Sequence, residues 1–325
     1  MLMFLVLALC VEAALAIENK TDRFWSCPQD KQSRGVLQRA SGPEASQDVL
    51  LVSTFFRDTC HGTVLEIGAN EGTQLMTSLE FSKRGWRTVL IEGDPSVFAR
   101  LEKNRPDAMT IHAIAGREVR NETWITFNNP YLSGVDAWLP WEKLSRMIKA
   151  GSLREKSRTV LLASPLSTLM LQRGVWTVDL FSLDVEGSER AVLETINYDV
   201  INVGVLLIER GRYKGIPAYL SKQGVEYVGN ILYDAVFVSR KYRESTLKEP
   251  DGSPSSLAAL SQRLNRAVSR PSMKKRLCAC MANVKSRSLS QEASQDCTSF
   301  CVGEGTTPAT SRQHTTPLRL TVTTS

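Results

Sequence analysis

The sequence predicts an α/β domain over residues 48–240, built on a mostly parallel sheet with an antiparallel strand at its C-terminal edge. Three observations predict it. Short apolar runs alternate with amphipathic stretches, which is the pattern of parallel strands joined by helices. Some of the apolar runs end at a glycine or an acidic residue. The last two runs lie close together and are separated by a short turn-bearing segment, which favours an antiparallel pair.

The first half of the domain repeats the strand-then-helix pattern. The first apolar run ends at Gly68, and the helical periodicity after it stops at Gly85, a residue type that commonly ends helices. The helix after the second run has Pro95 in its first turn, where proline is favoured. The expected strands are residues 63–67, 87–91 and 109–114, and the expected helices are residues 71–84 and one opening at Asp94-Pro95.

An irregular stretch over residues 129–160 separates the two halves and contains Pro130, Gly134 and Pro140. Such a long insertion is often a lid or a binding loop. Its tryptophans, Trp138 and Trp141, either stack on a sugar face or form a small core of the insertion, and the sequence leaves both readings open. Beyond it, the expected helices are residues 166–172 and 188–196, and the expected strands are 178–183, 203–208, 225–228 and 235–238.

The N-terminal segment indicates delivery to the secretory pathway. Residues 1–16 form an apolar run that is too short to span a membrane and ends in Ala14-Leu15-Ala16, a typical cleavage pattern. We therefore predict a signal peptide, followed by a polar lead-in over residues 17–47. The run lacks a basic leader, so an uncleaved membrane anchor is the alternative. Glycosylation sequons at Asn19 and Asn121 fit a chain that is luminal or secreted.

The basic charge is concentrated in the tail. Residues 1–240 contain 27 Lys and Arg against 28 Asp and Glu, whereas residues 241–325 contain 13 against 6. The predicted domain therefore has a net charge of −1, which argues against a nucleic-acid groove on it. Residues 241–325 are basic and rich in Ser and Thr, and they are expected to be partly disordered.

Six cysteines follow the predicted signal peptide, and an even number favours disulfide bonds in a secreted chain. Cys27 and Cys60 would tie the lead-in to the domain. The other four form a cluster in the tail, for which a zinc site is the alternative; no metal site is assigned to the domain. The clustered cysteines are Cys278, Cys280, Cys297 and Cys301.

The strongest motif joins the first strand to the first helix and reads Glu66-Ile-Gly68-Ala-Asn70-Glu-Gly72. Its glycines allow a sharp turn and a close approach of the backbone to a ligand, and the helix N-terminus offers free N–H groups. Glu92 stands at the end of the second strand, where a carboxylate can accept hydrogen bonds from both ribose hydroxyls. Together they predict a nucleoside-binding crevice.

The motif favours S-adenosylmethionine over a dinucleotide. Only Gly-x-x-x-Gly is present, without the third glycine of the dinucleotide fingerprint. An acidic Glu66 at the strand end would repel a pyrophosphate but suits an ammonium group. A nicotinamide-dependent oxidoreductase is the disfavoured alternative.

A second motif, Ser182-Leu-Asp184-Val-Glu186-Gly187-Ser-Glu189, follows the strand at 178–183. In an open α/β sheet this strand end borders the same crevice. Asp184 is the expected functional carboxylate, whereas Glu186 and Glu189 are equally well explained as stabilising the N-terminus of the next helix. The candidate general bases are Asp184 and Glu186, with His61 and His112 as weaker ones; His112 is better read as a packed or capping histidine.

These segments, with Leu90-Ile-Glu-Gly-Asp-Pro95 between them, resemble the FkbM-type methyltransferase family over about residues 48–240. The resemblance implies a Rossmann-like class I methyltransferase fold and S-adenosylmethionine as cofactor. It also implies O-methylation of a hydroxyl on a glycan or a small-molecule acceptor. Gly93-Asp94 departs from the residues common in the family after this glutamate, and the tail has no counterpart in it.

The resemblance also implies roles for individual residues. Glu92 would hold the ribose, Ala113 and Ile114 would flank the adenine, and Asp184 would sit beside the methyl donor. The methionine end would be lined by Glu66, Gly68, Ala69, Asn70 and Gly72. A non-catalytic secreted binding module on the same scaffold is a further alternative, because the cytosol makes S-adenosylmethionine and a luminal enzyme would need it imported.

Overall fold

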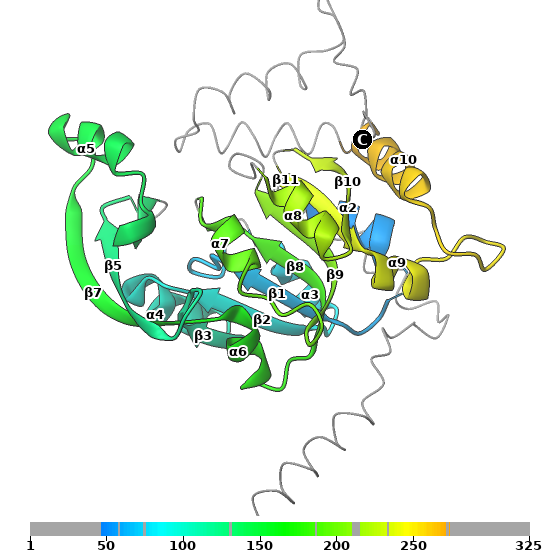
Figure 1. The fold of residues 1–325 in the computed structure, drawn as a ribbon, viewed down its shortest axis with the longest axis horizontal. Coiled ribbons are helices and arrows are strands. Elements are labelled where there is room, and N and C mark those ends of the chain that lie inside the picture. Colours follow the sequence, from blue (N-terminus) through cyan, green and yellow to red (C-terminus); the bar gives the residue numbers. More distant parts are fainter. Residues whose placement is uncertain are drawn as a thin grey trace, which may run out of the picture.

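The structure, a computed structural model, describes residues 47–57, 59–73, 76–129, 132–185, 187–209, 215–232, 234–270 and 273. Its centre is a seven-stranded sheet in the order β10-β11-β9-β8-β1-β2-β3 (Figure 1). The strands are β1 (Thr63–Ile67), β2 (Arg87–Glu92), β3 (Met109–His112), β8 (Thr177–Leu183), β9 (Asn202–Glu209), β10 (Val225–Ile231) and β11 (Asp234–Ser239).

The sheet pairing confirms the predicted fold class. Strands β3, β2, β1, β8 and β9 are parallel neighbours. Strand β11 is antiparallel to both β9 and β10, so the last two apolar runs do form an antiparallel pair. The edge position itself is taken by β10, with β11 inserted between it and the parallel strands.

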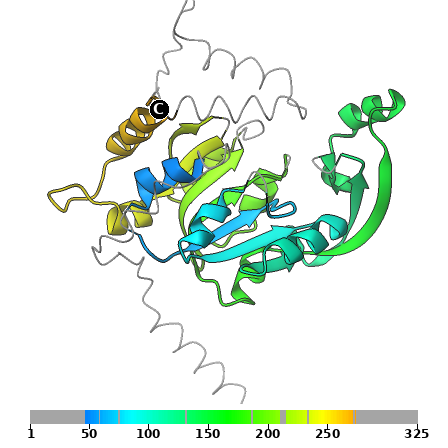
Figure 2. The same ribbon diagram turned by 180° about the vertical axis from the view of Figure 1, so that it is seen from behind.

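Helices cover both faces of this sheet (Figure 2). One face packs against α6 (Leu166–Leu171), α7 (Glu189–Leu193) and α8 (Ile216–Lys222). The other face packs against five helices. These are α2 (Gln47–Phe55), α3 (Ser78–Lys83), α4 (Pro95–Asn104), α9 (Arg240–Thr246) and α10 (Leu257–Val268).

The alternation of side chains along β1 decides which residues face which layer. Leu65 and Ile67 belong to the core with α6, α7 and α8, whereas Val64 belongs to the core with α2 and α10. Glu66 shares the face of Val64 and therefore lies beneath the N-terminus of α3. The helix expected from residue 71 begins only at Ser78, because residues 69–73 form the turn that follows β1.

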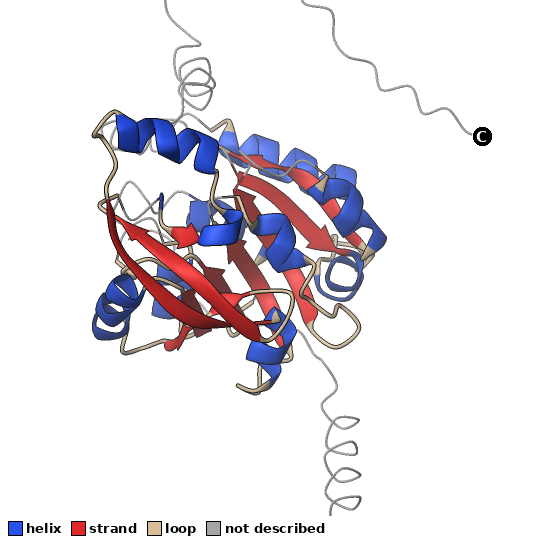
Figure 3. Cartoon of the chain, turned by 60° about the vertical axis from the view of Figure 1, so that its left-hand side comes forward, coloured by secondary structure: helices blue, strands red, loops and turns tan. Residues whose placement is uncertain are grey.

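The stretch expected to be irregular, residues 129–160, instead contributes to a second, four-stranded sheet in the order β4-β7-β5-β6, which begins at Ile114 and ends at Ser164 (Figure 3). It has its own small core, which contains Ile125, Phe127 and Leu144. Its elements are β4 (Ile114–Ala115), β5 (Arg120–Phe127), β6 (Gly134–Val135), the short helix η3 (Asp136–Trp138), α5 (Trp141–Lys149) and β7 (Glu155–Ser164).

The folded domain also extends past its predicted end at residue 240. Helices α9 and α10 follow β11, and Leu260 and Leu264 of α10 are fully buried against the sheet and α2. Residues 241–246 and 257–268 of the predicted tail are therefore helical. The remaining tail lies outside the described residues.

Several expectations fall on residues that the structure does not describe, namely the signal peptide, nearly all of the lead-in, the sequon at Asn19 and the tail cysteines. Cys60 is disulfide-bonded, and its pairing with Cys27, which lies outside the described residues, stays a prediction. Within the described part of the chain, no helix has the length and apolarity needed to cross a membrane.

Candidate functional site

A cavity lies at the carboxyl ends of β1, β2 and β8, beneath the second sheet. About 1050 Å³ around it is not filled by protein atoms, a volume that includes open solvent. Residues of the strand ends line it, and so do residues of α4 and of the second sheet. Among them are Ile67, Gly68, Asn70, Ile91, Glu92, Val97, Ala113, Ile114, Trp124, Gly134, Trp138 and Asp184.

Gly68 makes the turn at the end of β1 possible. Its φ is +81°, and its N–H and that of Ala69 both donate to the carbonyl of Ile91, at 3.1 and 3.2 Å. A Cβ at residue 68 would lie 1.8 Å from the carbonyl oxygen of Asp184. Because real Cβ atoms do not approach so closely, only glycine lets the ends of β1 and β8 meet here.

Glu92 is a buried carboxylate at the cavity wall, with 8% of its surface exposed. Its Oε1 accepts from the N–H of Asp94 at 2.7 Å, and its Oε2 accepts from the N–H of Asn70 at 2.9 Å. Burial raises its pKa to about 7, although these hydrogen bonds act to lower it. Each oxygen keeps a second lone pair that could accept from a ligand hydroxyl.

Asp94 joins α4 to the second sheet beside the cavity. Its Oδ1 accepts from the N–H groups of Ser96 and Val97, which makes it the N-cap of α4. Its Oδ2 accepts from the hydroxyl of Thr126 at 2.6 Å and from the indole N–H of Trp124 at 3.3 Å. Burial acts to raise the pKa of Asp94, but these hydrogen bonds outweigh it and lower the pKa.

The two tryptophans of the insertion have different surroundings. Trp138 lines the cavity. Trp141 packs edge-on against Phe127 in the core of the insertion, and its indole N–H donates to the backbone and side chain of Asp136. The reading as an insertion core therefore suits Trp141, and only Trp138 could contact a ligand in this cavity.

Asp184 follows β8 directly, and its N–H donates to the carbonyl of Ile67 at 3.2 Å. Its side chain is exposed and lines the cavity. Glu189, the first residue of α7, is fully buried and accepts from the N–H of Gly187 at 2.9 Å. Burial raises the pKa of Glu189, the hydrogen bond from Gly187 acts to lower it, and the charge of Asp184 adds to the rise. Glu186 lies outside the described residues.

The family comparison identifies this arrangement. Residues 66–227, which contain the strand ends around the cavity, match the family model for the methyltransferase FkbM domain. Residues 66–227 are an FkbM methyltransferase domain. The sheet order described above is the α/β arrangement that the resemblance to this family implied, so both the family and the fold class are confirmed.

Solved structures similar to the FkbM domain are distant. A TehB-like SAM-dependent methyltransferase from Corynebacterium glutamicum is 13% identical, with 65% of this chain and 95% of that chain covered and a TM-score of 0.34. An O-methyltransferase from Bacillus cereus, solved in complex with SAH, is also 13% identical, with 65% and 90% covered and a TM-score of 0.32. A search of curated proteins gave no match. The assignment rests on the family model.

Most of the predicted cofactor-binding residues of the FkbM domain line the cavity. Six do so, namely Gly68, Asn70, Glu92, Ala113, Ile114 and Asp184. The other three, Glu66, Ala69 and Gly72, do not line it. Both oxygens of Glu66 instead accept from the N–H groups of Thr77 and Ser78 at the start of α3, at 3.1 and 3.0 Å. Ala69 packs in the core beside Leu101, and Gly72 lies against the side chain of the same leucine.

The weaker base candidates lie outside the cavity. The ring of His112 is stacked on Phe98, with centroids 4.8 Å apart, and its Nε2–H donates to the carbonyl of Gly93 at 3.1 Å. This supports the reading of His112 as a packed histidine. His61 is exposed and does not line the cavity.

Sequence reasoning missed Trp124 as a cavity residue and Glu209 as the acid that ends β9. Trp124 lies between the expected elements, so no local sequence pattern pointed to a role in ligand binding. Glu209 carries the same signal as Glu92, since it directly follows the buried run 203–208.

The cavity fits S-adenosylmethionine, the methyl donor that the resemblance implies. Gly68 and Asn70 line it at the turn after β1, and Glu92 presents a carboxylate at the wall. Apolar side chains of Ile91, Val97 and Ile114 supply the surface that an adenine ring needs.

Proposed function

We propose that this chain is an S-adenosylmethionine-dependent O-methyltransferase that acts on a hydroxyl of a glycan or a small-molecule acceptor in the secretory pathway. One observation carries the donor part of the proposal. Gly68, Glu92 and Asp184 come from three different strand ends and line a single cavity within the FkbM domain.

In this proposal, Glu92 accepts hydrogen bonds from the ribose hydroxyls. The backbone N–H groups of Asn70 and Asp94 donate to the same carboxylate and hold it in place. Ala113 and Ile114 flank the adenine. The turn at Gly68 and Asn70 holds the methionine end. The bound donor supplies a methyl group on a sulfonium, and the methyl–sulfur bond breaks with its electron pair remaining on sulfur.

Asp184 is the candidate base for the acceptor hydroxyl, because its exposed carboxylate faces the cavity. It would take the hydroxyl proton as the oxygen bonds to the methyl carbon. Alignment of the oxygen with the methyl group can lower the activation barrier by roughly 7–11 kcal/mol. A general base typically increases the rate by about 10²–10⁴-fold. Glu186 stays a second candidate from the sequence.

The acceptor would enter beside Trp138, whose indole offers a surface on which a sugar ring can stack. Gly134 and Val135 border the same part of the cavity, and neither brings a charged side chain to it. This arrangement supports a glycan or another small hydroxyl compound as acceptor.

The secretory location is supported by the apolar run at residues 1–16 and its cleavage pattern. Asn121, in the second sequon, is exposed on β5, so a transferase could reach it. Deglycosylation of the chain recovered from whole cultures, cells and medium together, followed by N-terminal sequencing, tests both features. A start at Ile17 and a mass loss on deglycosylation are expected; an unshifted chain beginning at Met1 would contradict this location.

Calorimetric titration of the full chain with S-adenosylmethionine, S-adenosylhomocysteine and NAD tests the donor part. Both adenosyl compounds should bind, and NAD should not. Glu92→Gln should weaken S-adenosylhomocysteine by about 10–100-fold, because hydrogen bonds to a charged acceptor contribute about 1.5–3 kcal/mol. Asp179→Asn is the matched control, since Asp179 is a buried carboxylate in β8 that does not line the cavity.

The pKa of Glu92 adds a pH dependence to this test. Because burial raises it to about 7, the carboxylate is charged above pH 7 and protonated below. S-adenosylhomocysteine affinity should therefore rise between pH 6 and pH 8 in the natural chain and stay nearly flat in Glu92→Gln. If none of the three compounds gives a binding heat, a non-catalytic binding module is favoured. If only NAD gives one, an oxidoreductase is favoured.

A further inference from the structure

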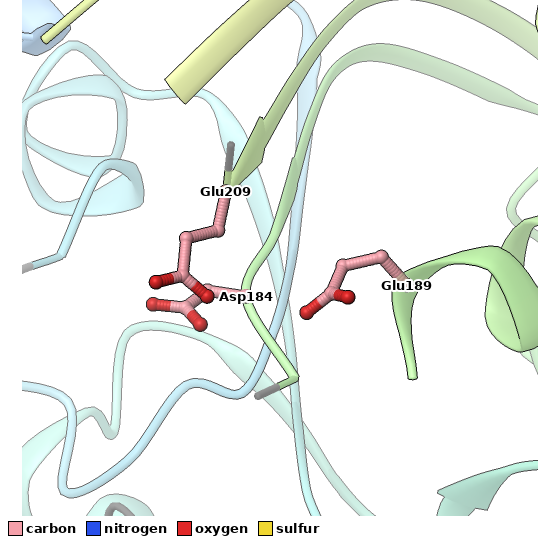
Figure 4. Close-up of side chains that lie close together, drawn as sticks. All are labelled: Asp184, Glu189 and Glu209. Carbon is pink, nitrogen blue, oxygen red and sulfur yellow. The ribbon is translucent and has the colours of Figure 1, made fainter. Parts of the chain in front are cut away.

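Three carboxylates from three elements converge (Figure 4), and one of them, Asp184, lines the cavity. Asp184 directly follows β8, Glu209 ends β9, and Glu189 begins α7. Strands β8 and β9 are parallel neighbours with Leu183 opposite Ile208. Asp184 follows Leu183 and Glu209 follows Ile208, so the two carboxylates lie side by side at the carboxyl ends of neighbouring strands.

The spacing of these carboxylates fits a bound cation. Each residue supplies one oxygen, and these oxygens all lie within 4.8 Å of one another. A divalent ion with metal–oxygen distances of about 2.0–2.6 Å holds oxygens on its opposite sides roughly 4–5 Å apart and neighbouring ones closer. Three oxygens at this spacing can share one ion with little movement of the backbone.

Glu189 provides a second, independent observation. The residue is fully buried, and its Oε1 accepts from the N–H groups of Gly187 and Val185, at 2.9 and 3.3 Å. Its Oε2 has no hydrogen-bond partner, and the carboxylate points toward Asp184 and Glu209 (Figure 4). Among the described residues, no lysine or arginine forms an ion pair with Glu189. A buried carboxylate oxygen without a partner is costly, and a cation would satisfy it.

We propose that Asp184, Glu189 and Glu209 bind a divalent cation with a preference for oxygen ligands, of the Mg²⁺, Mn²⁺ and Ca²⁺ class. The donor set consists of carboxylate oxygens alone, which selects such hard ions over those that favour sulfur or nitrogen. The sequence pattern by itself assigns no metal to the domain and explains Glu189 only as a helix-capping residue, so the site goes beyond it.

The cation also gives the acceptor hydroxyl a position, and this role rests on the proposed methyltransferase function. Asp184 belongs both to the cation site and to the cavity wall, so a bound ion would lie next to that wall. A hydroxyl bound to it loses its proton more readily, because the ion stabilises the oxygen anion. Asp184 would then have two roles, as a ligand of the ion that holds the acceptor hydroxyl and as the candidate base for its proton.

Titration of the chelator-treated full chain with Mn²⁺, followed by electron paramagnetic resonance of the free ion, tests the site. One Mn²⁺ should bind per chain, and Mg²⁺ should compete with it. Glu189→Gln should lower Mn²⁺ affinity at least about tenfold, because the amide keeps the shape and an acceptor for Gly187 but removes the charge. Glu209→Gln is the second variant, and thermal unfolding shows whether each variant is folded.

Glu142→Gln is the matched control, since Glu142 lies on α5 with its side chain 95% exposed and should leave Mn²⁺ affinity unchanged. Absence of Mn²⁺ binding by the natural chain, or equal binding by both folded variants, overturns the proposal. S-adenosylhomocysteine binding on the same samples separates it from the proposed function. Donor binding without Mn²⁺ binding refutes only the cation site, and Mn²⁺ binding without donor binding refutes only the methyltransferase.

Discussion

At the scale of single residues, Gly68 has the closest contact at its Cβ position among the glycines that the structure describes. It combines a left-handed φ of +81° with a carbonyl oxygen 1.8 Å from where a Cβ would stand. Gly68→Ala should therefore cost more than the roughly 1–2 kcal/mol of left-handed strain alone, since the ends of β1 and β8 must move apart. It should also abolish detectable S-adenosylhomocysteine binding, because the cavity lies between those ends.

Gly85→Ala is the control that separates strain from collision. Gly85 has a similar φ of +79°, but nothing lies within 4 Å of its Cβ position. Urea denaturation should show only the left-handed strain in this variant, with donor affinity unchanged. Equal losses of stability in the two variants would mean that the contact with Asp184 is relieved at no cost.

The acidic residues show how far strand-end patterns reach. Glu92 and Asp184 were predicted at the crevice from their positions after apolar runs, and both line the cavity. Glu66 carries a similar pattern but lies one residue before the end of β1, where its carboxylate accepts from the N–H groups of Thr77 and Ser78 at the start of α3. Glu66 is level with Leu90 and Ser182, so it lies two residues deeper in the sheet than Glu92 and Asp184. Sequence patterns do not place strand ends more accurately than about two residues.

At the scale of elements, α10 is a helix that the sequence analysis did not predict. Leu257, Leu260 and Leu264 follow the spacing of one helical face, and Ser256 caps the helix by accepting from the N–H of Ala259. The surrounding basic and Ser-rich composition masked this signal. Leu264 packs against Gly229 of β10, whose Cβ position lies 3.1 Å from its Cδ2.

Leu264→Ala should lower the free energy of unfolding by about 2–5 kcal/mol, as expected when a fully buried leucine is truncated. Asn265→Ala, on the exposed side of the same helix, should change it by no more than about 0.5 kcal/mol. Urea denaturation of both variants measures the difference. Equal stability would mean that α10 is not part of the cooperative fold and that the domain ends near residue 240.

The second sheet was missed for a different reason. Strand β7 is exposed along most of its length, with only Ala163 and Ser164 buried. Its sequence therefore lacks the alternation of apolar and polar residues that marks a strand with one buried face. Strand β5 likewise begins with exposed residues and is buried only at its end. Such strands are specified by pairing with each other, which a local pattern does not reveal.

At the scale of the whole molecule, the described domain carries its charge in an uneven way. Several carboxylates are buried, among them Asp48 and Asp179, and so is Arg105. Burial raises the pKa of Asp48 to about 7 and that of Asp179 to about 6. Each group binds a proton more tightly in the folded chain than in the unfolded one. By linkage, the folded state is then favoured as the pH falls from above these values toward 4, and it loses stability as the pH rises through them.

Asp179→Asn isolates one of these groups, far from the cavity. The Oδ2 of Asp179 accepts from the N–H of Thr63 at 2.8 Å, while its Oδ1 has no hydrogen-bond partner. An asparagine keeps the acceptor for Thr63 and carries no charge. At pH 8 it should stabilise the chain by up to about 3 kcal/mol, the equivalent of the raised pKa, and the gain should shrink toward zero between pH 6 and pH 4. Urea denaturation across this range measures it, and a gain that does not change with pH would contradict the raised pKa of Asp179.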